Sequence, residues 1–209
     1  WGNLFEEFGT SSGASALTSN FNVDIVDGGF YTMPNVSSGF WKKVVFSGTD
    51  PQTTVAFTGT ATVTDITAMV QDPKTGEIYV GGNFTQIGGV STNRVAKYTP
   101  STDTWSAVAA QTPNNPVQIL AIHPTTNELY MGGNFSNLGI NSTADFIARF
   151  DGTNWVDIHP DNATADNQPL TAISAINFRP DNGNLLIGGA FTGLGSVDAD
   201  AIAEFDFAT

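Results

Sequence analysis

The sequence predicts an all-β fold in which one antiparallel unit of four strands is repeated along the chain. The first observation is a phrase of strand-forming residues around a Gly-Gly pair, which occurs at residues 78–85, 129–136 and 185–192. A fainter copy precedes them at residues 25–30. The second observation is the spacing, because the pairs recur about every fifty residues, a period typical of repeat architectures.

Each repeat contains the same segments in the same order. An apolar run ends in an X-Pro turn, and the next segment carries the Gly-Gly pair. A third segment alternates apolar and polar residues up to an aromatic residue, which is typical of a half-buried strand. After a further turn, a fourth segment begins with Trp. The expected strands lie at residues 66–71, 78–85, 95–98 and 105–108, with counterparts at 119–122, 129–136, 147–150 and 155–158 and at 173–178, 185–192 and 202–205.

The first copy departs from this pattern. The stretch between Phe30 and Trp41 is too short for the usual third strand. The residues that follow predict an inserted hairpin, in which Val44–Phe46 pairs with Thr54–Phe57. We therefore expect the first unit to be degenerate.

Four-stranded sheets repeated around an axis describe a β-propeller, which leaves only short sheet edges. We expect one domain over residues 1–209 with about four blades. Trp1, Trp41, Trp105 and Trp155 mark the same phase of the repeat. The expected blades lie at residues 5–41 (degenerate), 42–105, 106–155 and 156–209.

Two interpretations of the chain ends follow from this phase. In one, residues 1–5 supply the outer strand of the last blade and close a ring. In the other, the chain is a segment of a longer propeller. Repeat arrays gain stability from contacts between neighbouring units, so an open arc of four free blades is the least favourable arrangement.

The residues of the second unit resemble the kelch family of β-propellers. That family has an apolar run, a Gly-Gly pair, and then a Tyr and a Trp separated by a short turn, and Gly81, Gly82, Tyr98 and Trp105 match this order. The longer sequence pattern, GGNFT followed by VAKY or IARF and then a Trp, is similar to kelch-related repeats of surface proteins. Examples are the Rax2-type cortical marker and bacterial exported repeat proteins. The resemblance covers roughly residues 60–209, and it implies a fold without transferring an activity.

The recurring glycines and aromatic residues are interpreted as structural. A Gly-Gly pair at a strand end indicates close backbone approach or dihedral angles that a Cβ atom would forbid. Large rings are expected to fill the layer between successive blades. The predicted structural set is Gly28, Gly29, Gly81, Gly82, Phe84, Tyr98, Trp105, Gly132, Gly133, Phe135, Phe150, Trp155, Gly188, Gly189, Phe191 and Phe205.

The amino-acid composition limits the classes of partner that the chain can bind. Lys and Arg number 7 against 20 Asp and Glu, for a formal net charge of −13. Nucleic acid is therefore excluded as a partner, and an anionic membrane surface is disfavoured, since binding to either needs basic residues. No apolar run has the length of a membrane span, so membrane insertion is not expected. The absence of cysteine excludes disulfides and thiol chemistry.

The polar, Lys-poor composition favours an extracellular or surface-exposed location, in the secreted fraction, a cell envelope or a virion. The chain contains five Asn-X-Ser/Thr sequons. Those at Asn83 and Asn134 belong to the repeat phrase and are interpreted as structural. Asn141 and Asn162 lie in polar loops and are the expected acceptors if the source organism glycosylates the protein.

No catalytic residue and no cofactor is predicted. The two histidines, His123 and His159, each precede a proline, and His123 aligns with Asp72 and Arg179. Such variety at one repeat position is typical of a solvent-facing turn. Calcium is the candidate ion, with Asp157, Asp161 and Asp166 as its weakly indicated ligands, because hard oxygen donors suit Ca²⁺. These acids lack the spacing of an EF-hand, and acidic loops are usually only solvated.

The function expected from these observations is that of a non-enzymatic surface module, which assembles with or binds another macromolecule, either a protein or a glycan. A virion fibre, decoration or receptor-binding protein is one alternative, and a carbohydrate-active propeller enzyme is another. Specificity is expected in loops, since a rigid scaffold presents its variable loops. The candidate loops are residues 47–58, 140–145 and 161–168.

Overall fold

The computed structural model describes residues 29–32, 42–47, 50–56, 62–138, 144–158, 173–191 and 201–206, with side chains from residue 66 onward. Within these ranges the chain forms strands and turns and has no helix. All strand pairs are antiparallel. The predicted all-β class is therefore confirmed.

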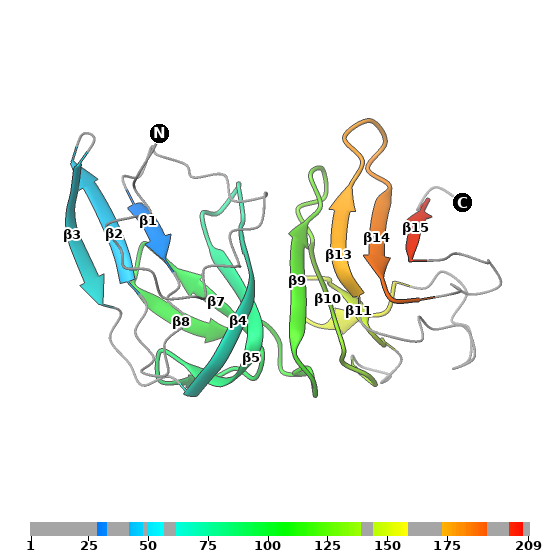
Figure 1. The fold of residues 1–209 in the computed structure, drawn as a ribbon, viewed down its shortest axis with the longest axis horizontal. Coiled ribbons are helices and arrows are strands. Elements are labelled where there is room, and N and C mark those ends of the chain that lie inside the picture. The colour runs from blue at the N-terminus through cyan, green and yellow to red at the C-terminus, as the bar shows by residue number, and fades with distance from the viewer. Residues whose placement is uncertain are drawn as a thin grey trace.

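The strands form four sheets (Figure 1). The first sheet contains β1 (Gly29–Thr32), β2 (Lys42–Ser47) and β3 (Asp50–Ala56). The second contains β4 (Thr62–Gln71), β5 (Ile78–Ile87), β7 (Val95–Thr99) and β8 (Thr104–Ala107), with β6 (Val90–Ser91) paired to β5. The third contains β9 (Val117–Ile122), β10 (Leu129–Gly133), β11 (Ile147–Phe150) and β12 (Trp155–Val156), and the fourth contains β13 (Ile173–Phe178), β14 (Leu185–Gly189) and β15 (Ile202–Phe205).

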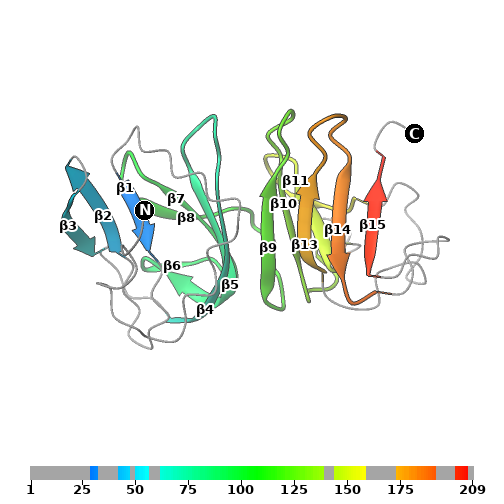
Figure 2. The ribbon, with the colours of Figure 1, turned by 45° about the horizontal axis from the view of Figure 1, so that its top comes forward.

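The last three sheets stack in chain order. In Figures 1 and 2, β9 lies between the second and fourth sheets, and it contacts β4 and β5 on one side and β13 on the other. Each of these sheets begins with the strand that touches its neighbour and proceeds outward strand by strand. This is the arrangement that the repeated order of segments predicts.

The first sheet differs from the predicted organisation. The expected hairpin is present as β2 and β3, with Val44 opposite Thr54 and Val45 opposite Thr53. Among the described strands, this hairpin pairs with β1 and not with β4, β5, β7 or β8, the other strands of the expected blade 42–105. Most of the expected first blade and residues 1–5 lie outside the described residues.

The apolar side chains of the described sheets gather into three clusters. One fills the junction between the second and third sheets, and another fills the junction between the third and fourth. The third cluster lies on the remaining face of the second sheet. Phe84, Phe135, Phe191 and Trp155 are at most 2% exposed, as predicted, whereas Trp105 is only half-buried.

The first glycine of two pairs, at Gly81 and Gly132, lies beneath the next sheet. A Cβ atom at Gly81 would lie 2.7 Å from Cγ1 of Val117, and one at Gly132 would lie 2.8 Å from Cγ2 of Ile173. Val117 and Ile173 both occupy the first position of the strand that begins the following sheet. The predicted close approach is therefore confirmed at these two glycines.

The residue before the third strand of each repeat has a left-handed backbone. Its φ is 69° at Arg94, 63° at Phe146 and 63° at Ala201. In every repeat its carbonyl accepts a bond from the second glycine of the pair, and its N–H donates to the phenylalanine carbonyl of the repeat phrase. The same two bonds recur in three different sequence contexts, so the repeat itself imposes this strained conformation, which costs a non-glycine residue about 1–2 kcal/mol.

Replacing Ala201 with glycine should therefore stabilise the protein. Glycine tolerates the positive φ, and its greater loss of backbone entropy offsets only part of the gain, so we expect about 0.5–1 kcal/mol. Urea denaturation followed by circular dichroism measures the change. Ala203→Gly is the matched control, because Ala203 lies within β15 without a positive φ and glycine there should destabilise by about 0.5–1 kcal/mol.

Candidate functional site

The polar residues that the sequence singled out meet at the turns between the first two strands of each repeat. Asp72, His123 and Arg179 occupy the first position of these turns. Each donates its N–H to the residue five positions on and accepts from the residue four positions on. The fourth residue after each has a positive φ, of 74° at Gly76, 64° at Asn127 and 79° at Gly183. The three turns therefore share one backbone geometry.

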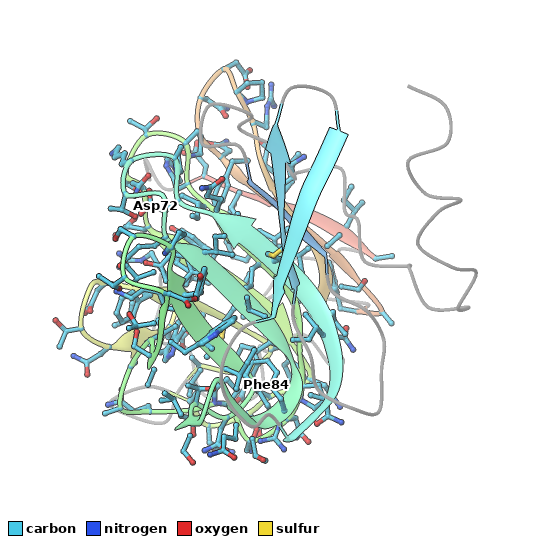
Figure 3. The ribbon with its side chains drawn as sticks, turned by 90° about the vertical axis from the view of Figure 1, so that its left-hand side faces the viewer. Asp72 and Phe84 are labelled. Carbon is cyan, nitrogen blue, oxygen red and sulfur yellow. The ribbon has the colours of Figure 1, made fainter. Side chains whose placement is uncertain are left out.

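Asp72 closes its own turn and reaches the next one. Its Oδ1 accepts from the N–H groups of Lys74 at 2.7 Å and Thr75 at 3.2 Å, and its Oδ2 accepts from Nδ2 of Asn127 at 2.9 Å. The side chain is 4% exposed. Figure 3 shows that Asp72 lies among the turns and Phe84 toward the opposite end of the sheet. The carboxylate is thus a structural link between the second and third sheets.

His123 makes the same two connections with an imidazole. Its Nδ1 accepts from the N–H groups of Thr125 and Thr126, both at 3.1 Å, and Nε2 lies 3.2 Å from the carbonyl oxygen of Gly183. Because Nδ1 accepts twice, this pattern assigns the proton to Nε2, which donates to Gly183.

The predicted solvent-facing position of His123 is wrong. The ring is 8% exposed and packs edge-on against Phe178, with 4.7 Å between the ring centroids. The physical reason is that the turn supplies two N–H groups to whatever acceptor stands at its first position, and both carboxylate and imidazole can serve. Variety at this position reflects shared hydrogen-bonding capacity, and not exposure.

Arg179 changes the pattern in the third turn. Its guanidinium binds Asp181 within the turn and Glu204 on β15. In the earlier repeats the equivalents of Glu204 are the cations Lys97 and Arg149, which pair with Glu77 and Glu128. The third repeat has Asn184 in place of that acid, and Asn184 donates to Glu204 at 2.8 Å. The charge on the third strand has thus changed sign, and its charged partner has moved from the sixth residue of the turn to the first.

The two tyrosines of the repeat phrase are held neutral. Burial raises the pKa of Tyr79 to about 12, with Glu77 and Asp72 adding to the effect. Burial, together with Glu128, likewise raises the pKa of Tyr130 to about 12. Both phenols therefore remain protonated near neutral pH and serve as packing groups with one polar end.

Removing the imidazole of His123 should loosen the junction between the third and fourth sheets. His123→Ala leaves two turn N–H groups and the Gly183 carbonyl without their partner, at an expected cost of about 1–3 kcal/mol. His123→Asp should retain more stability, because its carboxylate can accept both N–H groups as Asp72 does. Urea denaturation measures both. Equal losses in the two variants would show that ring packing on Phe178, and not the turn bonds, provides the stabilisation.

Asp72 should make the stability depend on acid pH. Burial alone raises the pKa of this carboxyl, but hydrogen bonds from Asn127, Lys74 and Thr75 outweigh burial and lower it below the ordinary value of 3.8. The unfolded chain therefore binds its proton first, so the stabilisation is complete above the ordinary aspartate pKa and is lost as pH falls through the lower folded value. We expect urea midpoints to fall from about pH 5 downward, and less so in Asp72→Asn.

High salt distinguishes the contribution of Asp72 to this pH dependence from that of Asp181, an exposed carboxyl whose pKa is also lowered. The hydrogen bond and charge of Arg179 lower the pKa of Asp181, which is fully exposed. At about 1 M salt the screening length is about 3 Å, so surface pairs weaken much more than buried hydrogen bonds. An acid dependence that disappears in salt would therefore contradict the assignment to Asp72.

Several residues that the sequence proposed fall outside the described ranges. These are Asp161, Asp166, His159, Asn141 and Asn162. Asp157 is described, and among the residues with a described placement no group of three or more His, Cys, Asp or Glu side chains is arranged to hold a metal ion. The same part of the chain contains no helix that is long and apolar enough to cross a membrane.

Sequence reasoning missed the links between successive turns. Asp72 bonds to Asn127, and His123 bonds to Gly183, so the first position of one turn meets the fifth position of the next. The available signal was that Gly, Asn and Gly recur at the fifth position, where a positive φ is needed. That signal identifies the turn, but it does not say which neighbour the turn touches.

Comparison with known protein families matches one segment of the chain. A family described as "Domain of unknown function (DUF5122) beta-propeller" matches residues 74–101, which run from the first turn through β5 and β7 into the turn that follows. No curated protein matches the chain. The matched segment contains the Gly-Gly pair and the left-handed residue Arg94 that recur in the later repeats. Together with the antiparallel sheets, this match supports a β-propeller family for the chain.

Proposed function

We propose that the chain is a non-enzymatic, surface-exposed scaffold that assembles with or binds another macromolecule, either a protein or a glycan. The observation that carries this proposal is the use made of the reactive side chains at the turns. Both ring nitrogens of His123 and both carboxylate oxygens of Asp72 are engaged: Nδ1 and Oδ1 close their own turns, and Nε2 and Oδ2 bond to the turn of the next sheet. Groups with the chemistry for acid–base catalysis thus stabilise the scaffold.

The charge supports an extracellular or surface location. With a formal net charge of −13 the chain repels phosphate-rich partners, and a net charge far from zero favours solubility. The pairs Lys97–Glu77 and Arg149–Glu128 place cations against acids within the sheets. We therefore propose neutral glycans or proteins with basic patches as partners.

The finer assignment is part of the same proposal. We infer that the repeats are of the kelch-related kind and that the chain supplies about four blades. The supporting observations are the Gly-Gly pair, the aromatic residue of the third strand and the Trp of the fourth. The rings of Tyr98 and Trp105 contact each other with 5.0 Å between their centroids, and those of Phe150 and Trp155 with 5.4 Å.

A panel of insoluble and soluble polysaccharides tests the proposal. Cellulose, chitin, β-1,3-glucan and mannan would be incubated with the purified chain, with binding measured by co-sedimentation or affinity electrophoresis and cleavage by the release of reducing ends. Binding without cleavage supports the scaffold with a glycan partner. Cleavage that disappears on replacing one carboxylate would overturn it in favour of a carbohydrate-active enzyme.

A further inference from the structure

The two junctions between stacked sheets are built from the same positions. The face that each sheet offers to the next contains the first glycine of the pair and an aliphatic residue that opens the third strand. In the second sheet these are Gly81 and Val95, and in the third they are Gly132 and Ile147. Val95 is 1% exposed and Ile147 is fully buried. Each face is covered by a sheet that begins with Val117 or Ile173.

The fourth sheet presents the same face, and no sheet formed by the described residues covers it. Its equivalent residues are Gly188 and Ile202, and Ile202 is 68% exposed, the one large apolar side chain so exposed in the described part of the chain. A Cβ atom at Gly188 would meet only Ala175 and Ala201 of its own sheet, at 3.3 and 3.7 Å. Ala175 on β13 is also exposed, although its equivalents Ala68 and Ile119 are buried.

The turn between β13 and β14 also differs from the two earlier turns, because its first residue bonds to no following turn among the described residues. In the earlier repeats the first turn residue bonds to the next turn, through Asp72 to Asn127 and His123 to Gly183. Arg179 stands at that position in the fourth sheet, and its side chain is 41% exposed. A guanidinium has five N–H donors, so it can keep its acids and still donate to a turn carbonyl, as His123 does to Gly183.

We propose that the face formed by Ala175, Leu186, Gly188 and Ile202 is a docking surface for one further sheet of the same repeat. The occupant begins with a strand that places Val or Ile over Gly188, as Val117 lies over Gly81. Its turn offers a carbonyl to Arg179. This inference deepens the assembly role proposed above, because it names the partner that the exposed face accepts.

Continuity with the two existing junctions argues for this occupant, and charge argues against a second whole copy. A second copy would bring another formal charge of −13 to the contact, and such self-repulsion opposes association. A single added sheet brings the apolar face without most of that charge. Stacked repeats derive their stability from these neighbour contacts.

A single cysteine can report the covering of this face, because the chain contains none. Ile202→Cys would be labelled with a maleimide in the chain as it stands and in a chain extended after Thr209 by a second copy of residues 105–158. We expect the extension to slow labelling about tenfold or more, as burial limits exchange to transient opening. Ile147→Cys should be protected in both forms, and the exposed Ser101→Cys should react quickly in both.

A second variant tests whether docking at this face, and not another effect of the extension, slows the labelling at position 202. Adding Gly188→Val to the extended protein fills the space that the incoming Val or Ile needs, so rapid labelling at position 202 should return. The proposal is overturned if position 202 stays reactive in the extended protein while circular dichroism shows that the added unit has folded. It is also overturned if labelling of the unextended chain slows with rising concentration, since a second copy would then be the occupant.

The labelling experiment is independent of the polysaccharide panel. It contains no glycan or protein ligand, so a negative panel leaves the docking surface intact. Unprotected labelling in a folded extension would refute the docking surface and leave the proposed binding function standing. The two failures are therefore distinguishable.

Discussion

Gly133→Ala should destabilise the protein by about 3 kcal/mol or more, beyond the usual cost of one inserted methyl group. The new Cβ atom would lie 2.4 Å from the carbonyl oxygen of Pro116, 3.1 Å from Cα of Val117 and 3.3 Å from N of Gln118. All three are backbone atoms, so no side-chain rotation can relieve the contact. Relief requires β9 to move away from β10. Urea denaturation followed by circular dichroism would measure the loss.

Gly188→Ala is the control for this prediction, at the first glycine of its pair, whereas Gly133 is the second glycine of its own. Gly188 belongs to an equivalent Gly-Gly pair, but a Cβ atom there would meet its nearest atom, Cβ of Ala175, at 3.3 Å. We expect a change within about 0.5 kcal/mol, as for an ordinary surface substitution. If Gly188→Ala cost as much as Gly133→Ala, then the backbone conformation of the pair, and not the approach of neighbouring strands, would explain why glycine stands there.

The strands of the last three sheets could be predicted from the sequence because their signals are local. Alternation in Val95–Thr99, the apolar run in Val117–Ile122 and the turn after Gln71 each specify one element without reference to the rest of the chain. The role of the glycines was also predictable, because a glycine costs stability in a strand unless something approaches it closely. The identity of the approaching residue was not, since it depends on how the sheets stack.

The first sheet and the turns show where local signals are insufficient. The hairpin of β2 and β3 was predicted, but its pairing with β1 is a choice between long-range partners that the hairpin sequence does not encode. The burial of His123 was missed for a related reason. A turn residue is buried only when the turn of the next repeat packs against it. The residues around His123 carry no signal of that contact.

The same dependence on neighbours explains Ile202. Its strand has the same alternation as those of Val95 and Ile147, and the pattern alone predicts burial for all three. The structure buries two and exposes the third because, among the described residues, a sheet lies in front of only those two. Periodicity therefore identifies the faces of a strand that are built for burial, while the array decides which of them are covered.

Trp155→Ala should cost about 3–5 kcal/mol, the loss found when a buried aromatic ring is deleted. Trp155 has no exposed surface and belongs to the cluster between the second and third sheets, with Phe150 at 5.4 Å. Removing the ring opens a cavity at the edge where β12 pairs with β11, and a two-residue strand has little else to hold it. Circular dichroism during urea denaturation is the suitable measurement, because the substitution removes a fluorophore.

Trp105 and a conservative change together test why the loss occurs. Trp105 occupies the equivalent position but is half-buried, so Trp105→Ala should cost about half as much. Trp155→Phe should cost less than Trp155→Ala, because a phenyl ring keeps part of the apolar contact and leaves a smaller cavity. It also removes an indole N–H that is buried without an acceptor among the described residues. Equal losses in Trp155→Ala and Trp105→Ala would contradict a cost set by burial. The stabilisation would then come from the ring contact that each tryptophan makes with the third strand, Trp155 with Phe150 and Trp105 with Tyr98.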